Sequence, residues 1–165
     1  MTELHFLQIR ELLNKHKIVY QHIVHEHVHH SSDAAKIRGT NLSEAAKAII
    51  LKVELKDKLP QDKFVFIQAV IPGDQRIDLK KIKNLFDSRN VQLASPEEVL
   101  EKTGCTIGSV PPFGNLFNIP IYLDELILQK EQIVFSAGTH HDSIIIKPED
   151  YVRVVEPKVV DLRKE

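Results

Sequence analysis

The fold class follows from a continuous apolar run, Phe64-Val65-Phe66-Ile67-Gln68-Ala69-Val70-Ile71, which the turn formers Pro72-Gly73-Asp74 end. A short run of this kind predicts a buried strand. Upstream, residues 48–53 are apolar and β-branched, and they predict a second strand. Around these two segments the pattern alternates between helical and extended stretches, without an internal repeat.

Further elements are predicted where apolar residues recur with helical or extended periods and where capping residues stand at the ends. Ser95-Pro96-Glu97-Glu98 has the cap, proline and early acids of a helix start, and Gly104 ends that helix. The mixed order favours an α+β fold with a mixed sheet over a strict βαβ repeat. We expect helices at 2–16, 77–86 and 96–104, helical turns at 33–38, 41–47 and 148–154, and strands at 18–24, 91–94, 119–128, 132–137, 143–146 and 159–162.

The length and composition are those of one globular domain, which we expect to span residues 1–165. Cys105 is the only cysteine, so a disulfide within the chain is impossible. No apolar run approaches the length of a membrane helix, and residues 1–10 lack the order of a signal peptide, so we expect a cytoplasmic protein without a membrane partner. The formal net charge of −1 gives no reason to expect tight nucleic-acid binding.

The first candidate site is the loop Gly104-Cys105-Thr106-Ile107-Gly108-Ser109-Val110-Pro111-Pro112-Phe113-Gly114. Its glycines let the backbone approach a ligand, and its prolines stiffen the loop, so that its N–H groups could hold an oxyanion. The loop lacks the Gly-Lys-Ser/Thr ending of a nucleotide-binding P-loop, which excludes that kind of phosphate site. The alternative is a surface connection that is rich in turn formers.

Two further segments carry polar groups beside apolar ones. Lys47 lies among alanines and isoleucine where the predicted helical turn gives way to a strand; it either extends along apolar surface, forms a pair or serves a site. Ser136-Ala137-Gly138-Thr139-His140-His141 follows an apolar strand. His140 could bind a substrate or exchange a proton near neutral pH, whereas the alternative is a polar hairpin turn.

Weaker candidates are the lone cysteine and a histidine cluster that consists of His22, His25, His27, His29 and His30. In a strand, His25, His27 and His29 would share one face and could bind a metal ion, but the spacing is not that of a zinc-binding helix, so a solvated polar edge is favoured. Cys105 has no base beside it in sequence, which favours a buried structural thiol over a nucleophile.

Taken together, the motifs resemble the YbaK family, also called the prolyl-tRNA-synthetase-associated or INS editing domain, over residues 5–162. Several of them resemble its freestanding YeaK branch. The motifs are His25-Glu26, Ile37-Arg38-Gly39-Thr40, Ala45-Ala46-Lys47-Ala48-Ile49, Leu93-Ala94-Ser95-Pro96-Glu97-Glu98-Val99, Thr103-Gly104-Cys105, Gly108-Ser109-Val110-Pro111-Pro112-Phe113, Ser136-Ala137-Gly138, Ser143-Ile144-Ile145-Ile146-Lys147 and Asp150-Tyr151.

The resemblance implies a mixed, curved β-sheet flanked by helices and an aminoacyl-tRNA deacylase that acts in trans. Such an enzyme hydrolyses the ester between a wrong small amino acid, such as serine, threonine or alanine, and the terminal adenosine of tRNA. It implies no metal and no cofactor. The expected partner is the tRNA acceptor end, bound transiently, with an aminoacyl-tRNA synthetase as a further candidate.

The resemblance also assigns roles to residues. The family's lysine corresponds to Lys47, its Gly-x-x-x-Pro loop begins at Gly108, its strand-end glycine is Gly138, and a following histidine is His140, with His141 as the adjacent alternative. We expect backbone N–H groups around Gly108 and Gly138 to hold the carbonyl oxygen or water, and Lys47 to anchor the terminal nucleotide. The expected substrate-binding residues are Ser109, Val110, Pro111, Pro112, Phe113, Gly114 and Thr139.

Three rival functions stay open from the residues: a binding module for an aminoacyl group or nucleotide without turnover, a hydrolase that uses Cys105, and a metalloprotein built on the histidine cluster. The lysines raise a separate question, because they gather in two stretches that form either a basic rim for RNA or a solvated face. The stretches are Lys47, Lys52, Lys56, Lys58 and Lys63, and Lys80, Lys81 and Lys83.

Overall fold

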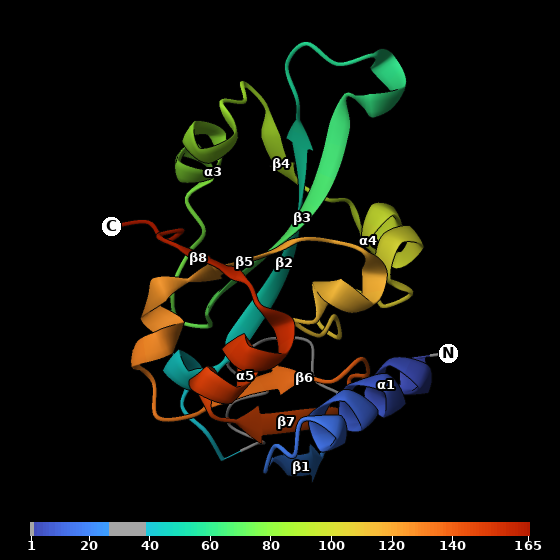
Figure 1. Cartoon of the computed structure of the whole chain (residues 1–165), viewed down its shortest axis with the longest axis vertical. Coiled ribbons are helices and arrows are strands. Elements are labelled where there is room, and N and C mark those ends of the chain that lie inside the picture. The colour runs from blue at the N-terminus through green and yellow to red at the C-terminus, as the bar shows by residue number, and fades with distance from the viewer. Residues whose placement is uncertain (1, 27–38) are drawn as a thin grey trace.

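Two β-sheets and the helices around them make up the fold in a computed structural model, which describes residues 2–26 and 39–165 (Figure 1). The predicted helical turn at 33–38 and three histidines of the cluster, His27, His29 and His30, lie outside the described residues. The α+β class is confirmed, and the strands divide between a five-stranded mixed sheet and a three-stranded sheet.

The five-stranded sheet is built on the two strands that the sequence indicated most strongly. β2 (Ala46–Glu54) and β3 (Phe64–Pro72) pair in antiparallel register over nine residues, and they form the long hairpin of Figure 1. β4 (Val91–Leu93) pairs antiparallel with β2. On the other side, β5 (Ile121–Asp124) and β8 (Lys158–Val160) add in parallel. The sheet is therefore mixed, as expected.

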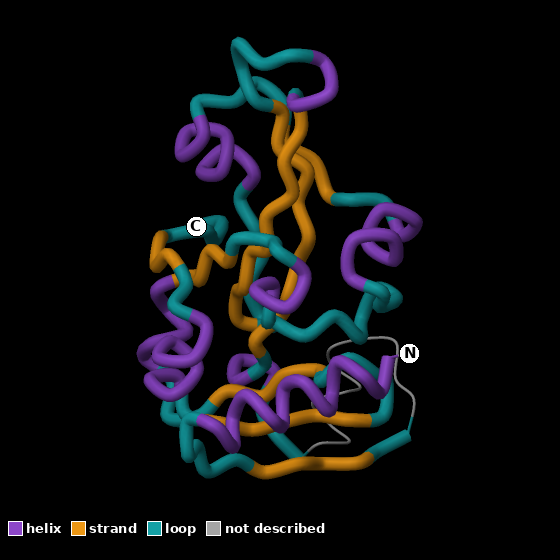
Figure 2. The backbone as a smooth tube through the Cα atoms, turned by 45° about the vertical axis from the view of Figure 1, so that its right-hand side comes forward, coloured by secondary structure: helices purple, strands orange, loops and turns teal. Residues whose placement is uncertain are grey.

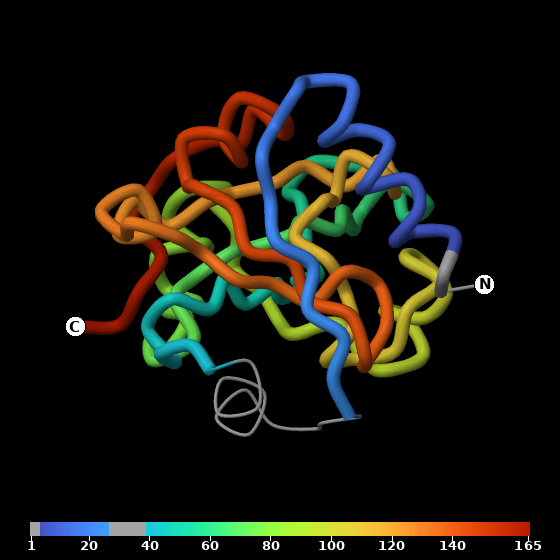
Figure 3. The backbone as a smooth tube through the Cα atoms, turned by 90° about the horizontal axis from the view of Figure 1, so that it is seen from below, coloured from blue at the N-terminus to red at the C-terminus, as the bar shows by residue number. Residues whose placement is uncertain are grey.

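The three-stranded sheet lies at the other end of the molecule. β7 (Asp142–Ile146) is its centre, with β1 (Gln21–Val24) and β6 (Ile133–Ser136) antiparallel on either side. α1 (Thr2–Lys15) lies across this sheet (Figure 2), and the view from below shows β1 in front of β7 (Figure 3). α1 joins a core that also includes residues of β6, β7 and α5 (Pro148–Val155).

Two helices cover opposite faces of the five-stranded sheet. Side chains alternate across a strand, and Leu51 accordingly packs with Ile82 of α3 (Leu79–Phe86), whereas Ile50 packs with Val99 of α4 (Pro96–Thr103). α4 begins as predicted, because Ser95 and Glu98 form a reciprocal capping box. β4 lies between the two helices in Figure 1.

Two predicted elements are wrong in extent. The helical turn expected at 41–47 is a single 3-10 turn, Leu42–Glu44, because the β2–β3 ladder already begins at Ala46; Lys47 consequently lies on a strand. The strand expected at 119–128 stops at Asp124, whose side chain accepts the Leu126 N–H and starts the 3-10 turn Glu125–Gln129. In the first place a long-range ladder outweighs the local capping signal, and in the second a local cap ends the strand that the apolar pattern predicts.

Candidate active site

A cavity of about 270 Å³ opens at the edge of β2. β4 pairs with β2 only through Leu51–Val53, and the chain then turns into α4. The β4 ladder therefore does not extend to residues 47–50 of β2, which line the cavity. The lining combines one charged side chain with apolar groups from β2, β4, α4 and the 104–114 loop. These residues are Lys47, Ala48, Ile49, Ile50, Leu93, Ala94, Val99, Ile107, Gly108 and Val110.

The cavity bends around the edge of β2. Ile50 packs with Val99 and Val110 on the α4 face of the sheet, and this part of the cavity is apolar. Lys47 is an odd number of residues from Ile50, so strand alternation places it on the α3 face. A ligand in this cavity would therefore contact apolar side chains on the α4 face of β2 and the Lys47 ammonium group on the α3 face.

The ammonium group of Lys47 is held against a turn of the backbone. Lys47 is partly buried, and its Nζ donates a hydrogen bond to Gln75 O at 3.2 Å. Burial lowers the pKa of Lys47; nearby Arg76 lowers it further, and Asp74 acts in the opposite direction. A weakly hydrated cation of this kind interacts more strongly with a negative ligand than a solvated surface lysine does.

The second half of the loop is anchored to the interior of the molecule. Gln68 of β3 is completely buried; it donates from Nε2 to Pro111 O at 2.9 Å and accepts the Gly114 N–H on Oε1 at 2.9 Å. Tyr151 of α5 donates its hydroxyl to Pro112 O. Releasing buried hydrogen-bonding groups costs free energy, so these contacts hold the loop rigid beside the cavity.

The tip of the loop is held from behind by the β6–β7 hairpin. Ser136 Oγ donates to Gly108 O at 3.0 Å, and His140 Nε2 shares a hydrogen bond of 2.7 Å with Thr106 Oγ1. A Cβ built on Gly108 would lie 3.3 Å from His140 Cε1, so the imidazole packs directly against the glycine. His140 thereby supports the loop that lines the cavity.

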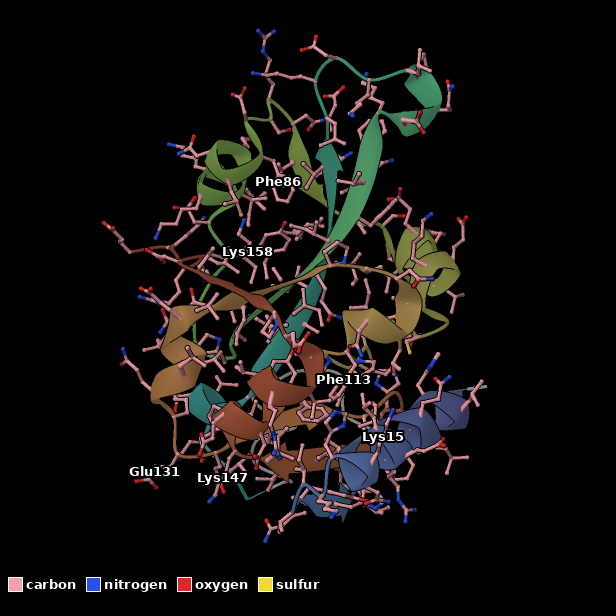
Figure 4. All side chains as sticks on the ribbon, viewed as in Figure 1. Lys15, Phe86, Phe113, Glu131, Lys147 and Lys158 are labelled. Carbon is pink, nitrogen blue, oxygen red and sulfur yellow. The ribbon has the colours of Figure 1, made fainter. Side chains whose placement is uncertain are left out.

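The structure divides the expected site residues into two groups. Lys47, Gly108 and Val110 line the cavity. The other members lie outside its lining: Ser109 donates from Oγ to Thr106 O, Phe113 is buried in the interior (Figure 4), and the rest belong to the anchored loop or the β6–β7 turn. The members outside the lining are Ser109, Pro111, Pro112, Phe113, Gly114, Gly138, Thr139 and His140.

Thr139, in the β6–β7 turn, binds groups of the same turn and does not line the cavity. Thr139 Oγ1 donates to Asp142 Oδ2 at 2.6 Å and accepts the backbone N–H groups of His141 and Asp142. His141 is exposed and lies near the His25 backbone, with 3.3 Å between Nδ1 and O. The adjacent His140 contacts the loop through Thr106 and Gly108.

Several lining residues were not expected from the sequence. Leu93, Ala94 and Val99 reach the cavity only because β4 and α4 pack beside β2, a contact between distant segments that no local pattern indicates. One signal was available for the loop anchor: Gln68 is the polar residue within the apolar run 64–71. A buried amide in such a strand requires hydrogen-bond partners, and the loop supplies them.

Cys105 has the properties of a structural thiol. It is completely buried, and burial raises its pKa to about 11, so it is protonated at neutral pH. The Cys105→Ala variant is expected to keep the deacylation that the resemblance implies within about twofold of the wild type and to lose about 1 kcal/mol of stability from the small void. Steady-state kinetics and thermal unfolding measure the two effects. A loss of turnover in a folded variant would restore the thiol-hydrolase alternative.

The described histidines of the cluster contact residues of β7 in the three-stranded sheet. His22 Nε2 lies 2.7 Å from Asp142 Oδ1, and His25 Nε2 lies 2.7 Å from Ser143 Oγ. Within residues 2–26 and 39–165, no group of three or more His, Cys, Asp or Glu side chains is arranged to hold a metal ion.

Over the described residues, 2–26 and 39–165, no helix combines the length and apolar character needed to cross a membrane.

Comparisons with known proteins point to aminoacyl-tRNA editing. The family model for the aminoacyl-tRNA editing domain matches residues 25–154. The Multifunctional Ser/Thr-tRNA deacylase ProXp-y of Escherichia coli K12 is 32% identical over 154 residues, which are 93% of this chain and 89% of that protein. A proline–tRNA ligase of Sulfurihydrogenibium is 33% identical over 64% of this chain but only 17% of its own length.

Solved structures support the fold. A hypothetical protein of known crystal structure matches with a TM-score of 0.82 at 24% identity, covering 94% of this chain and 99% of its own. A candidate trans-editing enzyme for prolyl-tRNA synthetase matches with a TM-score of 0.78 at 23% identity, covering 98% of each chain. The predicted class of activity, hydrolysis of an aminoacyl-tRNA ester, is confirmed by the family match and the named deacylase. This chain belongs to the aminoacyl-tRNA editing domain family.

Proposed function

We propose that this chain removes serine, threonine or alanine from mischarged tRNA in trans, with the reaction centred on Lys47. The observation that carries the proposal is a partly buried ammonium group on the wall of an otherwise apolar cavity of about 270 Å³. The similarity to a Ser/Thr-tRNA deacylase over most of both chains supports small hydroxylated amino acids as substrates.

The chemistry needs little beyond positioning and electrostatic stabilisation. An aminoacyl ester is already activated, so the enzyme has to place a water molecule and stabilise the developing oxyanion. In this proposal, Lys47 anchors the terminal nucleotide and adds positive potential at the ester. The Gly108 backbone forms another wall beside the reacting carbonyl. The vicinal hydroxyl of the ribose helps to activate the water.

The apolar end of the cavity selects the amino acid by size. Ile50, Ala94, Val99 and Val110 offer no side-chain hydroxyl, amide or charge to a substrate. A pocket of this kind distinguishes one methylene by about 1–3 kcal/mol and does not strongly reject an added hydroxyl. We therefore expect overlapping activity on serine, threonine and alanine and exclusion of bulky side chains.

Gly138 and His140 act as positioning residues in this proposal. The Gly138 carbonyl oxygen lies 4.0 Å from Cys105 Sγ, at the start of the loop, and His140 binds Thr106 and packs on Gly108. Both contacts fix the loop relative to the β6–β7 hairpin. Their role is to keep Gly108 in place, and they need no contact with the substrate.

The partner in the proposal is the acceptor end of tRNA, bound transiently. The formal net charge of −1 supports weak, salt-sensitive contact rather than a stable complex. Because proline–tRNA ligases contain a segment similar to this chain, a prolyl-tRNA synthetase is the candidate protein partner. We treat residues 1–165 as a single editing domain.

A panel of charged tRNAs tests the function. The purified chain is incubated with Ser-, Thr-, Ala- and Phe-charged tRNA, and the remaining ester is followed against a protein-free control. Hydrolysis of one or more of the small aminoacyl esters, with Phe-tRNA left intact, is the expected result. Binding without hydrolysis of any of the three small esters would identify a non-catalytic binding module instead.

The pH dependence gives an independent check on Lys47. The protonated amine is the active form in this proposal, and burial lowers its pKa, so kcat/KM is expected to fall as the pH rises through a value below the usual lysine range. Rates are measured after subtraction of spontaneous ester hydrolysis. The Lys47→Arg variant, whose guanidinium stays charged, should lose this alkaline limb. An identical limb in both proteins would exclude Lys47 as its source.

A further inference from the structure

A second hollow lies next to the candidate active site and shares a wall with it. Its volume is about 590 Å³, and it is open to solvent between the start of α3 and the C-terminal segment. The side chain common to both hollows is Leu93, which is 58% exposed. The second hollow is lined by Ile77, Asp78, Leu79, Lys80, Leu93, Lys164 and Glu165.

Lys47 and the second hollow are related through Leu93 and through the segment that follows β3. Leu93 lies opposite Leu51 in the β2–β4 ladder, so it projects from the same face of the sheet as Lys47. Lys47 Nζ binds the Gln75 carbonyl, and the next residue, Arg76, accepts the Lys164 N–H on its carbonyl at 2.8 Å. The Gln75–Arg76 segment thus runs directly between Lys47 and the C-terminal residues, which lie beside it in Figure 1.

The exposed cations around this hollow are available to an anion. Arg76, Lys80 and Lys164 are exposed, and among the ion pairs of residues 2–26 and 39–165 none involves them. Other lysines differ, because they pair with carboxylates. In the other lysine stretch these are Lys52 with Glu98, Lys56 with Asp87, and Lys63 with Glu54, and beside the hollow Lys81 pairs with Asp161.

The two carboxylates in the hollow are engaged with other groups. Asp78 caps α3 by accepting the Lys80 N–H at 3.0 Å. The hydrogen bond to Asp161 is the main cause that raises the pKa of Lys81, and the charge of Glu165 adds a smaller effect in the same direction. Neither carboxylate forms an ion pair with Lys80 or Lys164 among the described residues.

We propose that this hollow, on the basis of the proposed function, binds the single-stranded nucleotides that precede the terminal adenosine of the substrate. A tRNA whose amino acid lies in the apolar end and whose ester lies at Lys47 has to leave the cavity, and the wall at Leu93 is where the cavity adjoins the second hollow. Arg76, Lys80 and Lys164 contact the backbone phosphates, and Leu93 offers an apolar surface to a base. Cations beside apolar platforms are the usual means of holding single strands.

The test compares two substrates that share the reacting end. One is tRNA charged with whichever of serine, threonine or alanine the wild type removes fastest, and the other is the same amino acid esterified to adenosine alone. The variant Lys80→Ala/Lys164→Ala removes two exposed cations from the hollow. The control variant Lys56→Ala/Lys63→Ala makes the same change of net charge in the other lysine stretch.

The double variant of the hollow is expected to raise KM about tenfold for the charged tRNA, to leave kcat unchanged, and to hydrolyse the aminoacyl-adenosine at the wild-type rate. The salt dependence of log kcat/KM for tRNA should become shallower by about 0.7 for each phosphate that the protein no longer neutralises. The control variant should match the wild type with both substrates. Thermal unfolding confirms that all proteins are folded.

The outcomes separate this inference from the function on which it rests. If the wild type hydrolyses neither substrate, the proposed function itself fails. If the wild type is active but the variant of the hollow retains the wild-type KM for tRNA, the path of the nucleotides is wrong. Equal losses with tRNA and with aminoacyl-adenosine would also overturn the inference, because they would place the two lysines at the reacting end.

Discussion

The Lys47→Met variant is expected to hydrolyse aminoacyl-tRNA roughly 10²–10³-fold more slowly than the wild type, because it removes the charge that, in the proposed mechanism, stabilises the transition state inside a poorly solvated site. Methionine keeps most of the length of the side chain, so the wall of the cavity remains. The loss should appear in kcat/KM, measured with the small aminoacyl-tRNA that the wild type prefers.

The Lys47→Met variant should be at least as stable as the wild type, although its activity falls. Burial lowers the pKa of Lys47, which means that the proton binds more weakly to the folded state than to the unfolded chain. The charged lysine therefore works against folding at neutral pH, and its replacement by an apolar side chain should leave the unfolding midpoint unchanged or higher. This sign distinguishes a functional lysine from one that is retained for a structural contact.

Lys52→Met is the matched control. Lys52 lies on the same strand, pairs with Glu98 at 2.9 Å and lies outside the cavity lining. Its replacement should leave deacylation unchanged and cost little stability, since both side chains are only partly buried and an ion pair that solvent still reaches contributes modestly. A folded Lys47→Met protein with wild-type turnover would contradict the assignment of Lys47, and the cavity would then need another source of electrostatic stabilisation.

Local sequence signals predicted the elements that depend on local physics. The apolar run at 64–71 and the Ser95–Glu98 capping box gave β3 and the start of α4, since each signal lies within the element that it forms. The region 41–47 was harder to predict. Asn41 does precede a 3-10 turn, and its N–H donates to Glu44 Oε1, but the nine-residue ladder with β3 extends the strand back to Ala46. A capping signal indicates where a turn begins but not how soon a distant strand will end it.

The site was also predictable only in part, because contacts between distant segments decide which residues reach the cavity. Lys47 and Gly108 stood out as a lysine among apolar residues and as a glycine in a stiff loop, and both line the cavity. The loop residues beyond Val110 also stood out, but Gln68 and Tyr151 bind their backbone from the interior. Composition identified the loop as unusual, whereas the packing of β3 and α5 decides which of its residues reach the cavity.

The Gly108→Ala variant is expected to lower kcat/KM by about 10²-fold, the cost of displacing a reacting group by roughly 1 Å. Gly108 has a φ of +94°, a conformation that side chains rarely adopt, and its new methyl group would lie 3.3 Å from His140 Cε1. Because Thr106 holds the imidazole and Ser136 holds the Gly108 carbonyl, neither neighbour can move freely. The loop has to shift toward the cavity.

Gly39→Ala separates this steric effect from backbone strain. Gly39 also has a positive φ, +72°, but no described atom lies within 4 Å of the position of its Cβ, and it lies outside the cavity lining. Both variants should lose about 1 kcal/mol of stability from the unfavourable φ, yet only Gly108→Ala should lose activity. If the two variants have equal activity at equal stability, the position of Gly108 does not control catalysis. If truncating His140 in the Gly108→Ala background restores part of kcat/KM, the imidazole is the group that forces the loop into the site.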